Sequence, residues 1–142
     1  MNKILKVSWK QVDLIMEQLA RDIQNSTVKP KYIYGISRGG LTPAVMLSHK
    51  LKGIPVTFNP SEDFVLFIDD ISDEGKSLTY YSTLSRCYTT ATLFIKKDTA
   101  FVPDYYVNEV DRDIWVQFPW ELDGAEMKRS AKLREFKEIK RR

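Results

Sequence analysis

Residues 64–78 read Phe-Val-Leu-Phe-Ile-Asp-Asp-Ile-Ser-Asp-Glu-Gly-Lys-Ser-Leu. The first five are apolar and do not alternate with polar residues, which is typical of a strand buried on both faces of a parallel sheet. Asp69 and Asp70 follow this predicted strand directly, and Gly75 opens a turn into a helix predicted over residues 78–86. Because ligands of open α/β sheets bind beyond the carboxyl ends of the strands, we expect a binding site at this point of the chain.

Helical and extended patterns alternate on both sides of this segment. Ser8 and Gln11 form a capping box before a helix predicted over residues 9–23, whose apolar residues recur at spacings of three and four. A second helix is expected to begin near Thr42, with Pro43 at its first position. Further strands are predicted over four short segments, residues 32–36, 90–95, 105–107 and 114–116. The alternation predicts an α/β fold with a mainly parallel central sheet flanked by helices.

Composition limits the class of protein and of site. The chain has 142 residues, 43% of them apolar, which suffices for one compact domain and excludes disorder of the whole chain. A single cysteine, Cys87, and a single histidine, His49, exclude a disulfide scaffold and metal sites built from several Cys or His. No stretch of about 18 apolar residues occurs, and residues 1–6 lack the apolar core of a secretory signal. We therefore expect a cytoplasmic protein without a membrane span.

The net charge of +3 is concentrated at the end of the chain. Residues 125–142 contain eight basic and three acidic residues, a net charge of +5, which leaves −2 for the remainder. We therefore divide the chain into a domain of residues 1–124 and a basic tail or helix of residues 125–142. A solvated terminal segment is the simpler interpretation of this tail. The alternative is contact with nucleic acid, although no aromatic RNA-binding motif accompanies it.

Two polar segments that follow predicted strands supply the groups of a candidate site. Asp69, Asp70 and Asp73 are carboxylates suited to sugar hydroxyls or a divalent cation, and the turn at Gly75 offers backbone N–H groups to a phosphate. The second segment is residues 37–40, Ser-Arg-Gly-Gly. Together they predict a ligand with hydroxyls and a phosphate, such as a phosphorylated sugar with Mg²⁺. The alternative is an acidic pair that only caps a turn and a helix.

Residues 65–78 resemble the phosphoribosyl-pyrophosphate (PRPP) binding motif of type I phosphoribosyltransferases. That motif has an apolar strand, two acidic residues, two apolar or small residues and then Asp-Thr-Gly-x-Thr. The resemblance runs in order from about residue 4 to residue 121 and is most specific to the bacterial xanthine-guanine phosphoribosyltransferases. Five further segments carry it. The first runs from Ser8-Trp9 through the first predicted helix, and the others are residues 36–43 (Ile-Ser-Arg-Gly-Gly-Leu-Thr-Pro), 93–96 (Leu-Phe-Ile-Lys), 103–107 (Pro-Asp-Tyr-Tyr-Val) and 115–121 (Trp-Val-Gln-Phe-Pro-Trp-Glu).

The resemblance implies an enzyme of purine salvage that transfers 5-phosphoribose from PRPP to xanthine, guanine or hypoxanthine and releases pyrophosphate. It implies that Arg38 and Gly39 hold the pyrophosphate, and that Asp69 and Asp70 hold the ribose hydroxyls and Mg²⁺. Asp73 is the implied general base near N7 of the purine. The implied 5′-phosphate loop consists of Asp73, Glu74, Gly75, Lys76 and Ser77.

The same resemblance assigns the purine to residues in the second half of the chain. Lys96 is the implied donor to the 6-oxo group, which favours oxo-purines over adenine. Trp115 is implied to stack on the base, while the Val116 backbone and Glu121 contact its 2-position. Family members commonly form dimers or tetramers, so a homo-oligomer is expected.

Two features depart from the family pattern. Glu74 stands where the motif has threonine, beside the expected phosphate, and Lys76 is positioned to offset its charge. Only residues 57–64 lead into the motif strand, where the family has a long flexible loop that closes over the site. The shortened or absent lid leaves an alternative open: a non-catalytic module that senses PRPP or a nucleotide and contacts nucleic acid through residues 125–142.

Overall fold

The computed structural model describes residues 3–121. In chain order they form β1 (Lys3–Lys6), α1 (Trp9–Gln24), β2 (Tyr32–Gly35), α2 (Leu41–Lys50), β3 (Val65–Ser72), α3 (Lys76–Ser82), β4 (Tyr88–Lys96), β5 (Asn108–Val110) and β6 (Ile114–Gln117). No helix in this part of the chain is both long and apolar enough to cross a membrane. The basic tail, residues 125–142, lies outside the described residues, so the division at residue 124 stays a prediction.

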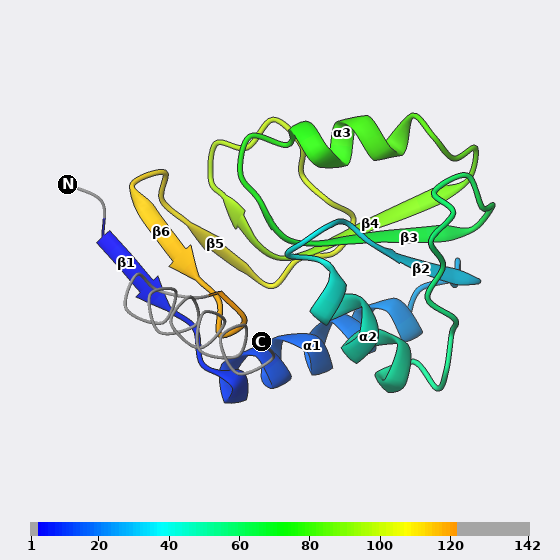
Figure 1. The fold of residues 1–142 in the computed structure, drawn as a ribbon, viewed down its shortest axis with the longest axis horizontal. Coiled ribbons are helices and arrows are strands. Elements are labelled where there is room, and N and C mark those ends of the chain that lie inside the picture. The colour runs from blue at the N-terminus through cyan, green and yellow to red at the C-terminus, as the bar shows by residue number, and fades with distance from the viewer. Residues whose placement is uncertain (1–2, 122–142) are drawn as a thin grey trace, which may run out of the picture.

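Four parallel strands in the order β2-β3-β4-β5 form the main sheet. Helices α1 and α2 lie on one side of this sheet and α3 on the other (Figure 1). Strands β1 and β6 pair in parallel as a separate small sheet, which lies at the carboxyl ends of the main strands. The predicted α/β fold with a mainly parallel sheet flanked by helices is confirmed.

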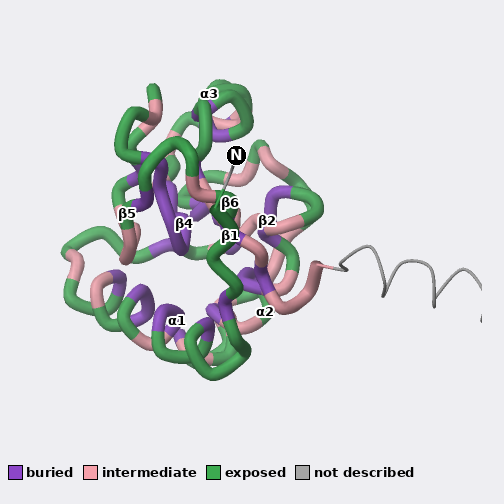
Figure 2. The backbone as a smooth tube through the Cα atoms, turned by 90° about the vertical axis from the view of Figure 1, so that its left-hand side faces the viewer, coloured by how far each residue is buried: buried purple, intermediate pink, exposed green. Residues whose placement is uncertain are grey.

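Strand β3 is buried on both faces, as its unbroken apolar run predicts. Leu66 and Ile68 pack into the core beneath α1 and α2. Val65 and Phe67, which point the other way, pack into a second core with Leu78 of α3. Figure 2 shows buried residues along β4 as well, whereas α1 alternates between buried and exposed residues. The sheet is thus the middle layer of three, and β3 and β4 form its centre.

Helix α1 confirms the predicted capping box and apolar face. The Gln11 backbone N–H donates to Ser8 Oγ at 3.1 Å, and the Ser8 backbone N–H donates to Gln11 Oε1 at 2.8 Å. These two bonds satisfy amides that the first turn leaves without partners. The residues that face the sheet are buried: Val12, Ile15, Met16, Leu19, Ala20 and Ile23.

The predicted end of the central strand is wrong. β3 continues to Ser72, so Asp69 and Asp70 lie within the strand instead of after it. The reason lies in the neighbouring strands: β2 ends opposite Ile68, whereas β4 stays paired with β3 as far as Ser72. Beyond Ile68 the strand therefore has a neighbour on one side only, which leaves room for acidic side chains on the other.

Three other predicted boundaries are also wrong. Helix α3 begins directly after Gly75 and is shorter than the predicted residues 78–86, because the left-handed φ of 85° at Gly75 already completes the turn. Tyr105 forms only an isolated bridge to β4, and the strand predicted over residues 105–107 is β5, further along. Pro43 is the third residue of α2 instead of the first, because Gly40 starts the helix earlier.

Gly40 lies where the start of α2 meets the ends of β2 and β3. A Cβ atom at this position would clash with the carbonyl oxygen of Ile68 and would stand 2.7 Å from the Ile36 nitrogen. Both contacts are with backbone, which cannot rotate away as a side chain can. Only glycine therefore allows the loop before α2 to approach β3 this closely.

We predict that Gly40→Ala lowers the free energy of unfolding by at least about 1–3 kcal/mol, the usual cost of forcing an extra carbon into a packed site. Urea denaturation measures this. Lys10→Ala is the control, because Lys10 is exposed on helix α1, and its effect is expected to stay within about 0.5 kcal/mol. A Gly40→Ala protein with the wild-type urea midpoint would contradict the packing described.

Candidate active site

The acidic pair lies where β3 emerges from the core. Both carboxylates are half-buried. The Asp70 backbone N–H donates to Asp69 Oδ1 at 2.9 Å, and the Ile71 N–H donates to Asp70 Oδ1 at 2.7 Å. Burial, and secondarily the charge of Asp70, raises the pKa of Asp69 to about 8, and burial also raises the pKa of Asp70. A bound cation or sugar hydroxyl would relieve the cost of two desolvated negative charges side by side.

These two carboxylates fit a Mg²⁺ ion that arrives together with a phosphorylated substrate. Within residues 3–121 no group of three or more His, Cys, Asp or Glu side chains could hold a metal ion alone. Mg²⁺ usually takes one or two protein carboxylates and fills its other positions with water and substrate phosphate oxygens. Asp69 and Asp70 therefore match the implied Mg²⁺ in number and chemistry, as part of a site that the substrate completes.

The loop between β2 and α2 touches this pair. A Cβ atom on Gly39 would clash with the Asp70 carboxylate, with Oδ1 only 2.8 Å away, so the backbone at Gly39 lies directly against Asp70. The preceding Ser37–Arg38 peptide bond is cis. Arg38 is exposed and forms no ion pair with any residue that the structure describes. The structure thus brings the two polar segments of the sequence together.

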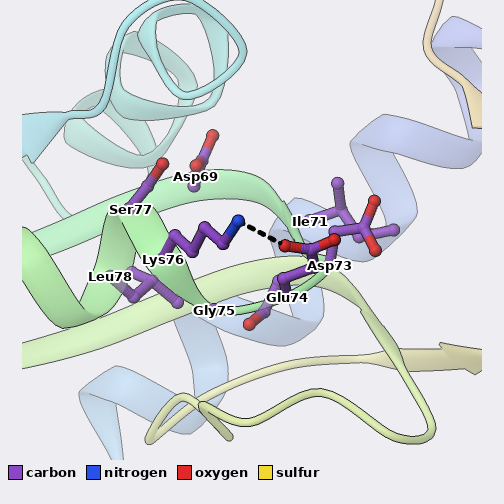
Figure 3. A pocket seen from close by; sticks show the side chains of 9 residues that line it. Asp69, Ile71, Asp73, Glu74, Gly75, Lys76, Ser77 and Leu78 are labelled. Atoms are coloured by element: carbon purple, nitrogen blue, oxygen red, sulfur yellow. Dashed lines mark ion pairs between the residues drawn. The ribbon is translucent and has the colours of Figure 1, made fainter.

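A cavity of about 230 Å³ opens beside the pair, between β3 and α3. It is lined by Asp69, Ile71, Ser72, Asp73, Glu74, Gly75, Lys76, Ser77 and Leu78 (Figure 3). The amides of Lys76, Ser77 and Leu78 belong to the first turn of α3 and have no acceptor within that helix. All five residues of the implied phosphate loop, 73–77, therefore line one cavity next to Asp69.

The turn before α3, which forms one wall of this cavity, packs against the loop after β4. Ser72 is buried, and its Oγ donates to the Phe101 carbonyl at 2.7 Å and lies 2.9 Å from Thr99 Oγ1. Gly75 packs so closely on Phe101 that an added Cβ would stand 2.6 Å from its Cβ. The loop after β4 thus supports the turn before α3. Sequence reasoning missed this support, because Phe101 belongs to no motif and the motif requires only an apolar or small residue at Ser72.

Glu74 and Lys76 pair with each other at the mouth of the cavity. Lys76 Nζ lies 2.9 Å from Glu74 Oε2 (Figure 3). The hydrogen bond from Lys76 lowers the pKa of Glu74 below its ordinary value. The carboxylate that replaces the usual threonine is thus matched by a cation two residues on. This pair is the arrangement that the spacing of the two residues suggested.

Asp73 and Lys96 are linked through Arg112, in the turn between β5 and β6. Arg112 forms an ion pair with Asp73 Oδ1, and its Nη2 also donates to the Asp73 carbonyl at 2.9 Å. Lys96 is buried at the end of β4, and its Nζ donates to the carbonyls of Arg112 and Ile114. Arg112 is a site residue that the sequence analysis missed, since its Asp-Arg-Asp context carries no recognisable motif.

The remaining predicted purine contacts lie on or beyond β6. Trp115 is 56% exposed, an unusual state for so large an aromatic ring, while Val116 beside it is buried. Both directly follow Ile114, whose carbonyl holds Lys96. Burial raises the pKa of Glu121, and the negative charge of Asp70 raises it further. Glu121 is therefore electrostatically coupled to the acidic pair, which its position in the sequence did not indicate.

Residues 57–64 do not form a lid. Phe64 donates its N–H to the Cys87 carbonyl at 2.8 Å, and Ser85 Oγ donates to the Glu62 carbonyl at 2.7 Å. These contacts hold the segment to the loop before β4, at the amino ends of β3 and β4, whereas the acidic pair lies toward the carboxyl end of β3 (Figure 1). The expected loss of the flexible lid is therefore observed in this part of the chain.

Comparison with known proteins identifies relatives of the whole domain. The xanthine-guanine phosphoribosyltransferase of Cereibacter sphaeroides (strain ATCC 17025 / ATH 2.4.3) is 28% identical, in an alignment that covers 82% of this chain and 86% of the relative. The solved purine phosphoribosyltransferase of Pyrococcus horikoshii is 33% identical, with a TM-score of 0.74, over 84% of this chain and 95% of that one.

A third relative shows the fold alone. The Helicobacter pylori xanthine-guanine-hypoxanthine phosphoribosyltransferase shares 21% identity, with a TM-score of 0.71, over 89% of this chain and 99% of that one. A scan against models of protein families finds no match. The 33% identity to the P. horikoshii protein extends over nearly all of that protein's length, and the acidic pair, the glycine loop and the cavity occur together here. The chain therefore belongs to the purine phosphoribosyltransferases of the type I phosphoribosyltransferase family.

Proposed function

We propose that this protein transfers the 5-phosphoribosyl group of PRPP to an oxo-purine (xanthine, guanine or hypoxanthine) and releases pyrophosphate. The observation that carries the proposal is the desolvated pair Asp69 and Asp70, flanked by the backbone of Gly39 on one side and by the cavity of residues 73–77 on the other. PRPP has the matching pattern: ribose hydroxyls between a pyrophosphate and a 5′-phosphate.

Each part of PRPP has a proposed partner. The 5′-phosphate lies in the cavity of residues 73–77, where the amides of the first turn of α3 and the Ser77 hydroxyl are available. The ribose hydroxyls donate to Asp69 and Asp70. The pyrophosphate lies against Gly39 and the exposed guanidinium of Arg38. When bound, Mg²⁺ supplies Lewis-acid neutralisation of the pyrophosphate oxygens near Asp69 and Asp70.

The transfer step exchanges one bond at C1 of the ribose for another. A purine ring nitrogen forms the new bond while the bond to pyrophosphate breaks, and C1 passes through an oxocarbenium-like state. Negative charge grows on the leaving pyrophosphate, and the Arg38 guanidinium stabilises it. Asp73 accepts the proton that the purine loses, a role that needs a carboxylate within hydrogen-bond reach of N7.

Recognition of the purine depends on Lys96. Its ammonium group has three N–H donors, and two of them are used by the carbonyls of Arg112 and Ile114. The third remains for the 6-oxo group of the purine. The 6-amino group of adenine is a donor and cannot accept from an ammonium, so adenine is disfavoured. Trp115 stacks on the ring, and the Val116 backbone and Glu121 contact the 2-position.

We extend the proposal to a cytoplasmic enzyme of purine salvage that forms homo-oligomers. Leu41 and Val45 are exposed on one face of α2, one turn apart, and such apolar surface suits contact between copies. The alternative of a non-catalytic sensing module is not supported, because the relatives named above are phosphoribosyltransferases. The nucleic-acid contact in that alternative depended on residues 125–142, outside the described residues.

We predict pyrophosphate release that needs PRPP, Mg²⁺ and an oxo-purine, and that adenine does not support. Asp73→Asn is expected to lower the rate about 100-fold, a typical contribution of a general base. A coupled pyrophosphate assay measures both. Asp63→Asn is the matched control, since Asp63 is an exposed carboxylate paired with Arg86 far from the cavity. Release that is independent of the base, or unaffected by Asp73→Asn, would refute the assignment.

A second prediction concerns the contact between the glycine loop and the acidic pair. Gly39→Ala places a methyl group against the Asp70 carboxylate and must push that side chain aside. We expect the KM for PRPP to rise about tenfold, which corresponds to about 1.4 kcal/mol of lost binding. The wild-type KM in this variant would show that Asp70 does not bind PRPP.

A third prediction follows from the pKa of Asp69. The folded value of about 8 lies above the ordinary 3.8, so the folded protein holds a proton that the unfolded chain releases. The free energy of unfolding therefore falls as pH rises from about 4 to about 8. Asp69→Asn keeps the oxygen that accepts from the Asp70 N–H. Because asparagine does not ionise, this variant does not undergo the fall in the free energy of unfolding that Asp69 causes.

Thermal unfolding without ligand or metal is the measurement for this third prediction. We expect the melting temperature of Asp69→Asn to exceed that of the wild type by about 2 °C or more at pH 8, and to match it near pH 4. Equal melting temperatures at pH 8 would mean that the acidic pair is not strained in the free protein.

A further inference from the structure

Arg112 holds the predicted general base in two places. It forms an ion pair with Asp73 Oδ1, and its Nη2 donates to the backbone carbonyl of the same residue at 2.9 Å. Side chain and main chain of Asp73 are therefore both tied to one guanidinium. The other carboxylate oxygen, Oδ2, has no hydrogen-bond donor in the part of the chain that the structure describes. One oxygen is fixed and one stays free to accept a proton.

Arg112 is itself fixed by two groups. Asp98, in the loop after β4, accepts at its Oδ1 from both Arg112 Nε, at 2.9 Å, and Nη2, at 2.7 Å, and its Oδ2 accepts from Nε at 3.2 Å. Three contacts with one carboxylate restrict the rotation of the guanidinium plane. The Arg112 carbonyl accepts from Lys96 Nζ at 3.3 Å. Arg112 therefore connects the predicted base, Asp73, with the predicted purine-recognising group, Lys96, and its partners lie in two loops and at the end of β4.

This cluster is poorly suited to stabilising the fold. The side chains of Arg112, Asp73 and Asp98 are 44%, 52% and 63% exposed. Ion pairs in contact with water contribute little to the free energy of unfolding, because solvent screens them. The planar guanidinium of Arg112, held between two carboxylates, does restrict the orientation of each of them. We therefore expect Arg112 to affect the orientation of the Asp73 carboxylate more than the free energy of unfolding.

We propose that Arg112 is a positioning residue of the transfer reaction, which orients Asp73 so that Oδ2 receives the proton of the purine. This inference rests on the proposed function and adds to it a residue that acts through the base. Without the guanidinium, the Asp73 carboxylate can rotate about its side-chain bonds, and the fraction of bound purine in a reactive arrangement falls. Binding of PRPP is expected to change little, because Arg112 contacts neither the first turn of α3 and the Ser77 hydroxyl nor the acidic pair, the groups proposed to bind the 5′-phosphate and the ribose.

The expected signature is a change in kcat without a change in substrate binding. Arg112→Gln is expected to lower kcat about tenfold, a tenth of the typical effect of removing a general base, and to leave the KM for PRPP within about twofold. Arg112→Lys restores part of the loss, because a lysine supplies the charge without the fork. Asp98→Asn lowers kcat in the same direction by less, since it acts through Arg112.

A double-mutant cycle tests whether Arg112 acts through Asp73. Pyrophosphate release with PRPP, Mg²⁺ and guanine is measured for the wild type, Arg112→Gln, Asp73→Asn and the double variant. If the proposal holds, Arg112→Gln costs about tenfold in the wild type but less than about twofold once Asp73 is asparagine. An equal loss in both backgrounds, or no loss in the wild type, would overturn it.

Two controls separate the explanations. Arg86→Gln breaks another exposed ion pair, with Asp63 at 3.2 Å, and is expected to leave kcat unchanged. Melting temperatures of all variants show whether a loss comes from unfolding, which would overturn the positioning role. If the wild type shows no purine-dependent release, the proposed function fails and the inference with it. If the wild type is active and Arg112→Gln equally so, only the inference fails.

Discussion

The cost of burying two adjacent carboxyl groups, Asp69 and Asp70, is the constraint on which the site depends. The pair lies at the end of a strand buried on both faces, where burial raises the pKa of both carboxyls. No ion pair among residues 3–121 includes either of them, so their charge is left for a ligand to balance. Three features hold them there: the early end of β2, the long pairing of β3 with β4, and the absence of a side chain at Gly39.

The parts of the fold that rest on local patterns could be predicted. The capping box and apolar spacing define α1, and the apolar run defines the buried part of β3. The extension of β3 to Ser72 could not be predicted, because it depends on where its two neighbours end. The contact of Arg112 with Asp73 could not be predicted either. It joins residues 39 positions apart in the chain, and Arg112 belongs to no motif.

The proposed site has no lid from residues 57–64. Residues 57–64 are hydrogen-bonded at the amino ends of the main strands, so they do not shield groups at the carboxyl ends. The small sheet β1–β6 lies at the carboxyl ends of the main strands, with Trp115 exposed on it. In the proposed phosphate loop, Lys76 pairs with Glu74, which stands where the family motif has threonine. Without a lid from residues 57–64, water competes with the purine for C1 of the ribose.

That competition makes the product ratio the most direct measurement of the central claim, phosphoribosyl transfer to a purine. PRPP, Mg²⁺ and hypoxanthine are incubated with the protein, and the nucleoside 5′-monophosphate, ribose 5-phosphate and pyrophosphate are quantified together by chromatography. Transfer at the acidic pair predicts equal amounts of nucleotide and pyrophosphate, with little ribose 5-phosphate. Pyrophosphate matched by ribose 5-phosphate, with no nucleotide, would show that water is the acceptor and would contradict the proposed function.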